Sequence, residues 1–491
     1  MFKKIFTRLM LVLMFFSLTA CAGRNEDAAK EENKDKAASS EEVKKEDGKT
    51  DANGKTTIVF WHSMGGNLND AIDHLVEEYN KSQDKYIVKA EFQGEYDDAL
   101  TKLRSSASGK DVGADLVQVF DLGTRYMIDS GLIKPIQDFV DEDNYDTSKL
   151  EDNLLAYYTV DGKLNSMPFN SSTPLLYYNK DMFDKAGVEV PKSLEEMKEV
   201  GKKLKDSGVT EMPISMSVYG WWVEQFMSKQ GLELFDNNNG RDANPSKTVF
   251  EENGGVKNIL TAWKELKDEG IAPNVGKQGG DPEFKAGTSA MCFASTASLA
   301  QILSEVGDRF EVGTAYFPGV KESDDHGVSI GGASLYALNS GDEEKMKGTW
   351  DFIKFLVSVD SQTYWNANTG YFPVNKGVLD TDDFKELIKK SPQFETAIDQ
   401  LHDSKPEDQG ALATVFQESR QIIEKYIEEM LNDKLSPEEA SKKMSEEIDK
   451  ALESYNKVNK KWENTIIKPT CTCYQPWLYW WYLYFIHSYR L

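Results

Sequence analysis

The chain has 491 residues, with 57 basic and 82 acidic side chains that give a net charge of −25. Because so acidic a chain carries no basic patch interleaved with aromatic residues, nucleic acid is not an expected partner. Its 4 cysteines suggest no disulfide framework, and its 5 histidines offer little material for a metal site or an acid–base cluster.

The first 20 residues have the three parts of a bacterial secretory signal. Lys3, Lys4 and Arg8 form a basic start, and residues 9–18 form an apolar run too short to span a bilayer. Small residues then lead to Cys21, in an order that resembles the lipobox whose cysteine receives a diacylglycerol. We therefore predict a lipoprotein signal at residues 1–20 and lipid anchoring at Cys21 on the outer face of the cell membrane. An ordinary signal peptide with a chance cysteine is the alternative.

Residues 21–55 have the composition of a tether. They are mostly Lys, Glu, Asp, Ala, Ser and Gly, and Val43 is nearly alone as a core-forming side chain. Such a segment buries too little apolar surface to offset its ordering entropy, so we predict that it is disordered. Short stretches of solvated helix are the alternative and would not change its role.

Residues 56–466 have the pattern of an α/β body, long enough for two domains or one two-lobed domain. Its first elements are a buried strand at 57–61, a helix with Ile72, Leu75, Val76 and Tyr79 on one face, an alternating strand at 86–92, a helix at 96–106 and an apolar strand at 116–120. This order of strands and helices predicts a sheet with helices on its faces.

The same alternation continues to the end of the body. Further strands are expected at 175–178, 289–293 and 333–338, and helices at 193–207, 256–268 and 345–357. The last part is helical, because Ile423, Tyr426, Ile427 and Met430 share a stripe and Pro437 stands at a first helical position.

Residues 467–491 depart from this composition. They hold Cys471, Cys473 and a dense run of Trp and Tyr, which is rare on a soluble surface. We predict a disordered or non-native terminus. An interfacial membrane contact and a weak two-cysteine metal site are the alternatives.

One segment resembles a hydrolase motif. Residues 327–331 match G-x-S-x-G around Ser329, but a nucleophile elbow needs a strand before the serine and a helix after it. Here polar residues precede the motif and a strand-like stretch follows. Zinc, phosphate-loop and dinucleotide motifs are missing from the sequence. We therefore predict no enzyme activity, no catalytic residue, no metal and no cofactor.

Several segments together resemble family 1 extracellular solute-binding proteins of ABC importers. They lie at 57–64, 94–96, 116–124, 168–180, 294–295, 330–335 and 369–373. The resemblance spans 56–459 and is strongest to members that bind sn-glycerol-3-phosphate. It implies an α/β fold of two discontinuous lobes with a hinge and an interlobe ligand cleft. It also implies a monomer that delivers glycerol-3-phosphate or a glycerophosphodiester to a membrane permease; an oligosaccharide receptor is the alternative.

The resemblance also implies a ligand site. The matching positions are Tyr96, Asp121, Ser172, Ser295, Gly332, Tyr371 and Arg420. A guanidinium, hydroxyls and backbone amides suit a phosphate, while a carboxylate suits glycerol hydroxyls. Asp121 departs from the family pattern, which has the longer glutamate there.

Aromatic residues complete the implied site. Trp221 or Trp222 would supply a ring for the glycerol carbons, and an oligosaccharide would stack on Trp221, Trp222 and Trp365. Trp61 and His62 follow the first strand, and we assign them to the core. Arg420 has one simpler interpretation, which is a surface pair with Glu424 one helical turn away.

Overall fold

The computed structural model describes residues 50–51, 54–107 and 112–466, all within the compact unit 48–491. The predicted signal peptide, Cys21, nearly all of the predicted tether and the tail at 467–491 lie outside these residues. Among the described residues, no helix is both long and apolar enough to cross a membrane.

The first lobe is built on a five-stranded sheet with the order β2-β1-β3-β11-β6. Its strands are β1 (Thr56–His62), β2 (Tyr86–Phe92), β3 (Leu116–Phe120), β6 (Met167–Ser172) and β11 (Gly331–Ala337). β1 is parallel to both β2 and β3, while β11 is antiparallel to β3 and to β6. β3 and β6 therefore run in the same direction and end at the same edge of the sheet.

The second lobe contains a four-stranded sheet with the order β10-β7-β9-β8. Its strands are β7 (Pro174–Asn179), β8 (Met212–Ser215), β9 (Ser289–Ser295) and β10 (Val312–Tyr316). A short hairpin of β4 (Thr159–Val160) and β5 (Lys163–Leu164) stands apart from both sheets. The chain passes from the first sheet to the second at Thr173, and returns between β10 and β11.

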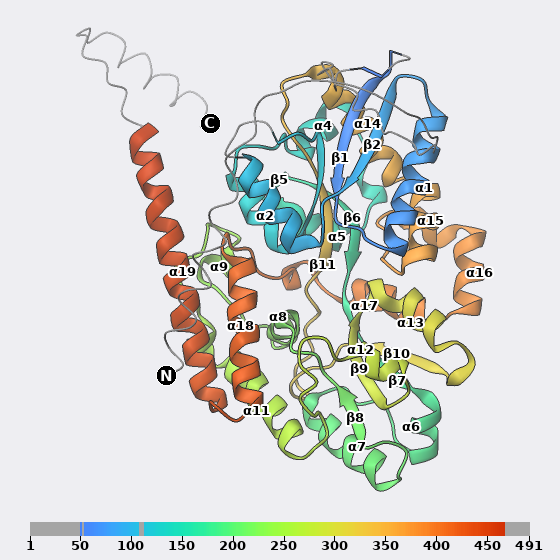
Figure 1. Ribbon diagram of the computed structural model, residues 1–491, viewed down its shortest axis with the longest axis vertical. Coiled ribbons are helices and arrows are strands. Elements are labelled where there is room, and N and C mark those ends of the chain that lie inside the picture. Colours follow the sequence, from blue (N-terminus) through green and yellow to red (C-terminus); the bar gives the residue numbers. More distant parts are fainter. Residues whose placement is uncertain (1–49, 52–53, 108–111, 467–491) are drawn as a thin grey trace, which may run out of the picture. The chain divides into compact units, whose positions relative to one another are not determined.

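Helices cover both sheets, as Figure 1 shows for α1 and α14 beside β1 and β2. In chain order the longer ones are α1 (Asn67–Ser82), α2 (Tyr96–Ala107), α4 (Ile136–Asp143), α5 (Asp152–Tyr158), α6 (Lys180–Ala186), α7 (Leu194–Asp206), α8 (Gly220–Lys229), α11 (Gly255–Asp268), α13 (Leu299–Val306), α14 (Glu343–Leu356), α15 (Val359–Thr369), α16 (Asp382–Lys390), α17 (Gln393–Asp403), α18 (Phe416–Leu431) and α19 (Pro437–Ile466). α18 and α19 lie side by side and pack on α11 (Figure 1).

Short elements join them: α3 (Thr124–Asp129), α9 (Asp236–Gly240), α10 (Phe250–Asn253), α12 (Asp281–Lys285) and single 3-10 turns, of which η1 (Asp121–Gly123) follows β3 and η3 (Thr296–Ser298) follows β9. The strands and helices predicted from the sequence are present with small shifts at their ends. The buried face of α1 carries the four predicted side chains. Trp61 and His62 are buried at 8% and 2% exposure, as assigned.

Candidate functional site

A cavity of about 690 Å³ lies between the two sheets. All nine positions predicted for the ligand site line it: Tyr96, Asp121, Ser172, Trp221, Trp222, Ser295, Gly332, Tyr371 and Arg420. They come from α2, η1, β6, α8, β9, β11, the segment after α15, and α18. The structure therefore brings together residues that span more than 300 positions of the chain.

The strand directions explain why these residues meet. Asp121 directly follows β3 and Ser172 ends β6, and these two strands end at one edge of the first sheet. The antiparallel β11 begins at that edge with Gly331 and Gly332. Ser295 ends β9 in the second sheet. In α/β proteins, ligands bind beyond the carboxyl ends of strands, and this cavity has that position.

The charged centre of the cleft is Arg420 on α18. Its Nε donates to Glu224 Oε1 at 2.7 Å, and its Nη2 donates to Glu224 Oε2 at 2.7 Å and to Asp121 Oδ2 at 3.2 Å. Asp121, Glu224 and Arg420 are 5%, 7% and 7% exposed. A two-pronged pair of this kind fixes the plane of the guanidinium.

Burial and charge shift the pKa values of this cluster. Burial raises the pKa of Asp121 to about 6, although the positive charge of Arg420 acts to lower it. For Arg420 burial alone would lower the pKa, but the negative charge of Glu224 leads the effects that raise it well above its usual value. Arg420 is therefore a fixed cation, whereas Asp121 is close to its titration range at neutral pH.

The alternative interpretation of Arg420 is wrong. Arg420 does not pair with Glu424 one turn along α18, because Glu424 bonds to Lys277 Nζ at 2.7 Å and accepts from the backbone N–H of Gly220 at 3.2 Å. Glu224, which the sequence did not single out, takes that place. Glu224 lies in the apolar, buried start of α8, but that local pattern does not indicate which cation its carboxylate pairs with.

Two adjacent glycines let the backbone approach the cleft. Gly332 has φ +90°, and a Cβ there would lie 2.1 Å from the carbonyl oxygen of Asn170. A Cβ on Gly331 would lie 2.6 Å from Trp221 Cζ2. The glycine pair is therefore required by close packing and, at Gly332, by the left-handed backbone.

Aromatic rings form much of the remaining wall. Tyr96 stacks on Phe120 with ring centroids 5.1 Å apart, and Trp222 stacks on Phe317 at 6.0 Å. The indole N–H of Trp222 donates a hydrogen bond to Ser217 Oγ at 3.1 Å. Trp365 does not line the cleft, which corrects its place in the sugar-stacking set. It is fully buried and stacks behind Tyr371.

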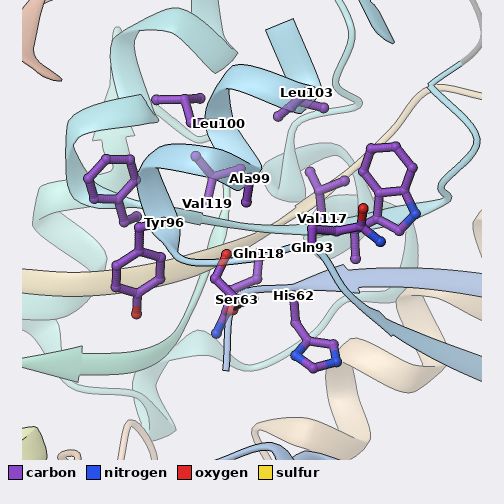
Figure 2. Close-up of a pocket in the computed structure, with 12 residues that line it drawn as sticks. His62, Ser63, Gln93, Tyr96, Ala99, Leu100, Leu103, Val117, Gln118 and Val119 are labelled. Carbon is purple, nitrogen blue, oxygen red and sulfur yellow. Dashed lines mark hydrogen bonds between the residues drawn. The ribbon is translucent and has the colours of Figure 1, made fainter. Parts of the chain in front are cut away.

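A chain of amides holds the Tyr96 hydroxyl in place. Gln118 Oε1 accepts from the backbone N–H of Ser63 at 2.9 Å, and Gln118 Nε2 donates to Asn170 Oδ1 at 2.8 Å. Asn170 Nδ2 donates in turn to Tyr96 Oη at 2.8 Å. Figure 2 shows Ser63, Gln118 and Tyr96 in the small pocket beside β3. Sequence reasoning missed both amides, because buried amides leave no periodic signal.

The serines differ in what they already bond. The Ser295 hydroxyl accepts from the backbone N–H of Ala297 at 3.2 Å and so caps η3. Within the described part of the chain, the Ser172 hydroxyl has no hydrogen-bond partner. Ser172 therefore faces the cavity with an unused donor and acceptor.

Ser329 does not have the setting of a nucleophile. It is 3% exposed, its hydroxyl accepts from Gln225 Nε2 at 2.7 Å, and β11 follows it where a helix would be needed. No group of three or more His, Cys, Asp or Glu side chains suited to a metal occurs among the described residues.

Comparison with known proteins shows which family the chain resembles. Residues 74–396 match the family model of bacterial extracellular solute-binding proteins. The chain is 30% identical over 421 residues to the sn-glycerol-3-phosphate-binding periplasmic protein UgpB of Escherichia coli (strain K12), covering 84% of this chain and 94% of that protein. The same figures hold for UgpB of Shigella flexneri serotype 5b.

Solved structures show the same fold. UgpB from Mycobacterium tuberculosis in complex with glycerophosphocholine is 23% identical with a TM-score of 0.68, covering 82% of this chain and 100% of that one. The cyclic α-maltosyl-1,6-maltose binding protein from Arthrobacter globiformis is 23% identical with a TM-score of 0.67 and the same coverage. These likenesses confirm the predicted two-lobed α/β fold.

Proposed function

Because this chain belongs to the bacterial extracellular solute-binding proteins, which serve ABC importers and are not enzymes, we propose that its ligand is glycerol-3-phosphate or a glycerophosphodiester. The observation that carries the proposal is the convergence of phosphate donors and a glycerol acceptor in one cleft. The curated relatives named above are glycerol-3-phosphate binders, which supports the same ligand class.

The phosphate end would lie against the hydroxyls of Ser172, Ser295 and Tyr371, the backbone at Gly332 and the guanidinium of Arg420. These groups line one cavity and are donors that a phosphate oxygen accepts from. Arg420 Nη1 makes no hydrogen bond to the described part of the chain, so two N–H groups remain for the ligand.

The glycerol end would lie against Asp121 and the aromatic wall. A carboxylate accepts hydrogen bonds from two neighbouring hydroxyls, and a flat ring packs on carbon–hydrogen faces. Trp221 is the better candidate of the two tryptophans, because Trp222 is engaged by Phe317, Phe293 and Ser217. Closure of the lobes on this ligand would present a changed surface to the permease.

A second candidate is an oligosaccharide. The cleft wall holds several aromatic rings, which is the setting in which sugars stack: Tyr96, Phe120, Tyr219, Trp221, Trp222, Phe293 and Tyr371. Some structures of the same fold are of sugar-binding proteins. Binding of a disaccharide with no response to any phosphoester would favour this candidate.

Thermal unfolding with a ligand panel tests the proposal. A phosphoester at a hundred times its Kd should stabilise the protein by about 2.7 kcal/mol. Ser172→Ala and Tyr371→Phe should weaken binding, while the matched controls Ser207→Ala and Tyr316→Phe, which change surface hydroxyls, should not. If no phosphoester in the panel raises the melting temperature, the proposed ligand class is wrong.

We also propose the membrane attachment and domain order predicted from the sequence. Residues 1–20 would be removed, Cys21 would carry the lipid, residues 21–55 would act as tether, and 56–466 would be a monomeric binding body. Cys21→Ser should abolish incorporation of a labelled fatty acid into the protein. Equal labelling of that variant and the parent would exclude Cys21 as the lipid site.

A further inference from the structure

The cleft has more carboxylates than cations. Its lining includes Glu95, Asp97, Asp121, Asp281 and Glu424 against Lys277, Lys285 and Arg420. Each of these cations already has a carboxylate partner. Lys277 bonds to Glu424 at 2.7 Å, and Lys285 bonds to Asp281 at 3.0 Å and Glu305 at 3.1 Å. A ligand anion therefore meets no cation in this lining whose charge is uncompensated.

Arg420 is the most strongly compensated of the three. Glu224 occupies its Nε and Nη2 edge with two bonds of 2.7 Å, and Asp121 takes the other Nη2 hydrogen at 3.2 Å. With both carboxylates ionised, the three side chains carry a net charge of −1. Nη1 makes no hydrogen bond within the described chain, so Arg420 keeps free donors while its charge is cancelled.

The two proposed ligand types differ in charge. A phosphomonoester carries about −1.5 to −2 at neutral pH, because its second pKa is about 6, whereas a phosphodiester carries −1. Repulsion by the net charge of the cluster grows with the ligand charge, and it is strong in a buried, low-dielectric site. The same donor set thus accepts a diester at lower electrostatic cost.

We propose that Glu224 is a specificity-determining residue that cancels the charge of Arg420, so that the cleft selects singly charged glycerophosphodiesters over doubly charged glycerol-3-phosphate. This inference rests on the proposed function and narrows its ligand. Asp121 acts in the same direction more weakly, because it makes one bond of 3.2 Å to Arg420 where Glu224 makes two of 2.7 Å.

Calorimetric titration of the full chain with glycerol-3-phosphate and with glycerophosphoglycerol tests this selection. The parent should bind the diester at least about tenfold more tightly. Glu224→Gln keeps the shape of the side chain and removes its charge, and should shift the affinity ratio toward the monoester by at least about tenfold. Glu269→Gln removes a surface carboxylate paired with Lys202 at 3.1 Å and should leave the ratio unchanged.

The pH dependence of the affinity ratio in the parent protein tests the inference even if the Glu224→Gln variant folds poorly. Between about pH 5.5 and pH 7.5 the monoester loses its second proton and Asp121 beside Arg420 ionises, and both changes should increase the preference for the diester as pH rises. An unchanged ratio in a folded Glu224→Gln protein, or a parent that prefers the monoester, overturns the inference and leaves the phosphoester function intact. A parent that binds neither compound overturns the proposed function itself.

Discussion

Changing Arg420 to alanine should destabilise the protein as well as abolish phosphoester binding. The change leaves Asp121 and Glu224 facing one another in a wall where they are 5% and 7% exposed. Breaking a buried ion pair by removing one partner costs about 3–5 kcal/mol. For a body of about 400 residues the entropy of unfolding is about 0.8 kcal/mol/K, so the melting temperature should fall by about 4–6 °C.

The loss should depend on pH in a defined direction. In the parent, burial raises the pKa of Asp121 to about 6 even with Arg420 beside it, and without the guanidinium the pKa must rise further. A carboxyl whose pKa is higher in the folded than in the unfolded state binds more protons when folded, so its stability contribution is lost as pH rises. The deficit of Arg420→Ala should therefore be largest above pH 7 and smaller near pH 5.

Scanning calorimetry of parent and variant at about pH 5 and about pH 7.5 measures both effects. Lys81→Ala is the control, because Lys81 forms an exposed i, i+4 pair with Glu77 at 2.7 Å and its loss should change the melting temperature little. The double change Arg420→Met with Glu224→Met should recover much of the stability but none of the binding. A variant that melts with the parent at pH 7.5, or whose deficit grows on acidification, would refute this reasoning.

Two further changes test the backbone and the titrating group. Gly332→Ala places a Cβ 2.1 Å from the Asn170 carbonyl oxygen at φ +90°, so the melting temperature and the ligand affinity should both fall. The control is Gly131→Ala, where φ is +68° and the space around the Cβ is open. That change should cost only the backbone strain of about 1 kcal/mol and should keep the affinity. The parent should lose stability between about pH 5 and pH 7 as Asp121 ionises. Asp121→Asn should therefore reduce the dependence of the melting temperature on pH in that range. An equal pH dependence in both proteins would show that Asp121 does not cause the loss.

The fold was largely predictable because its elements have strong local patterns. The 16-residue α1 has a clear apolar stripe and the 5-residue β3 is wholly apolar or buried, and both are present where the sequence places them. The positions of the cleft could be predicted from motifs, since Asp121 and Ser172 directly follow or end strands. The structure brings all of these positions into one cavity.

What failed were contacts that no local pattern encodes. Arg420 and Glu224 are 196 residues apart, and their pairing depends on how α18 packs on α8. Sequence spacing offered Glu424 as an alternative partner for Arg420, but Glu424 bonds to Lys277 instead. Trp365 was placed among sugar-stacking rings by residue type alone, yet its position inside the first lobe leaves it without exposure.

The two carboxylates on Arg420 have different positions relative to the hinge, and this gives each a different role. Glu224 lies on α8, which packs against α18, so its two bonds to Arg420 join elements of the same lobe. Asp121 follows β3 in the first lobe, so its single 3.2 Å bond joins the two lobes. If the lobes open about a hinge, as we propose for ligand entry, the bond to Asp121 would break while the bonds to Glu224 would persist. Under the proposed function, Glu224 would therefore hold the guanidinium in orientation before the ligand binds, and Asp121 would exchange its bond to Arg420 for bonds to the ligand as the lobes close.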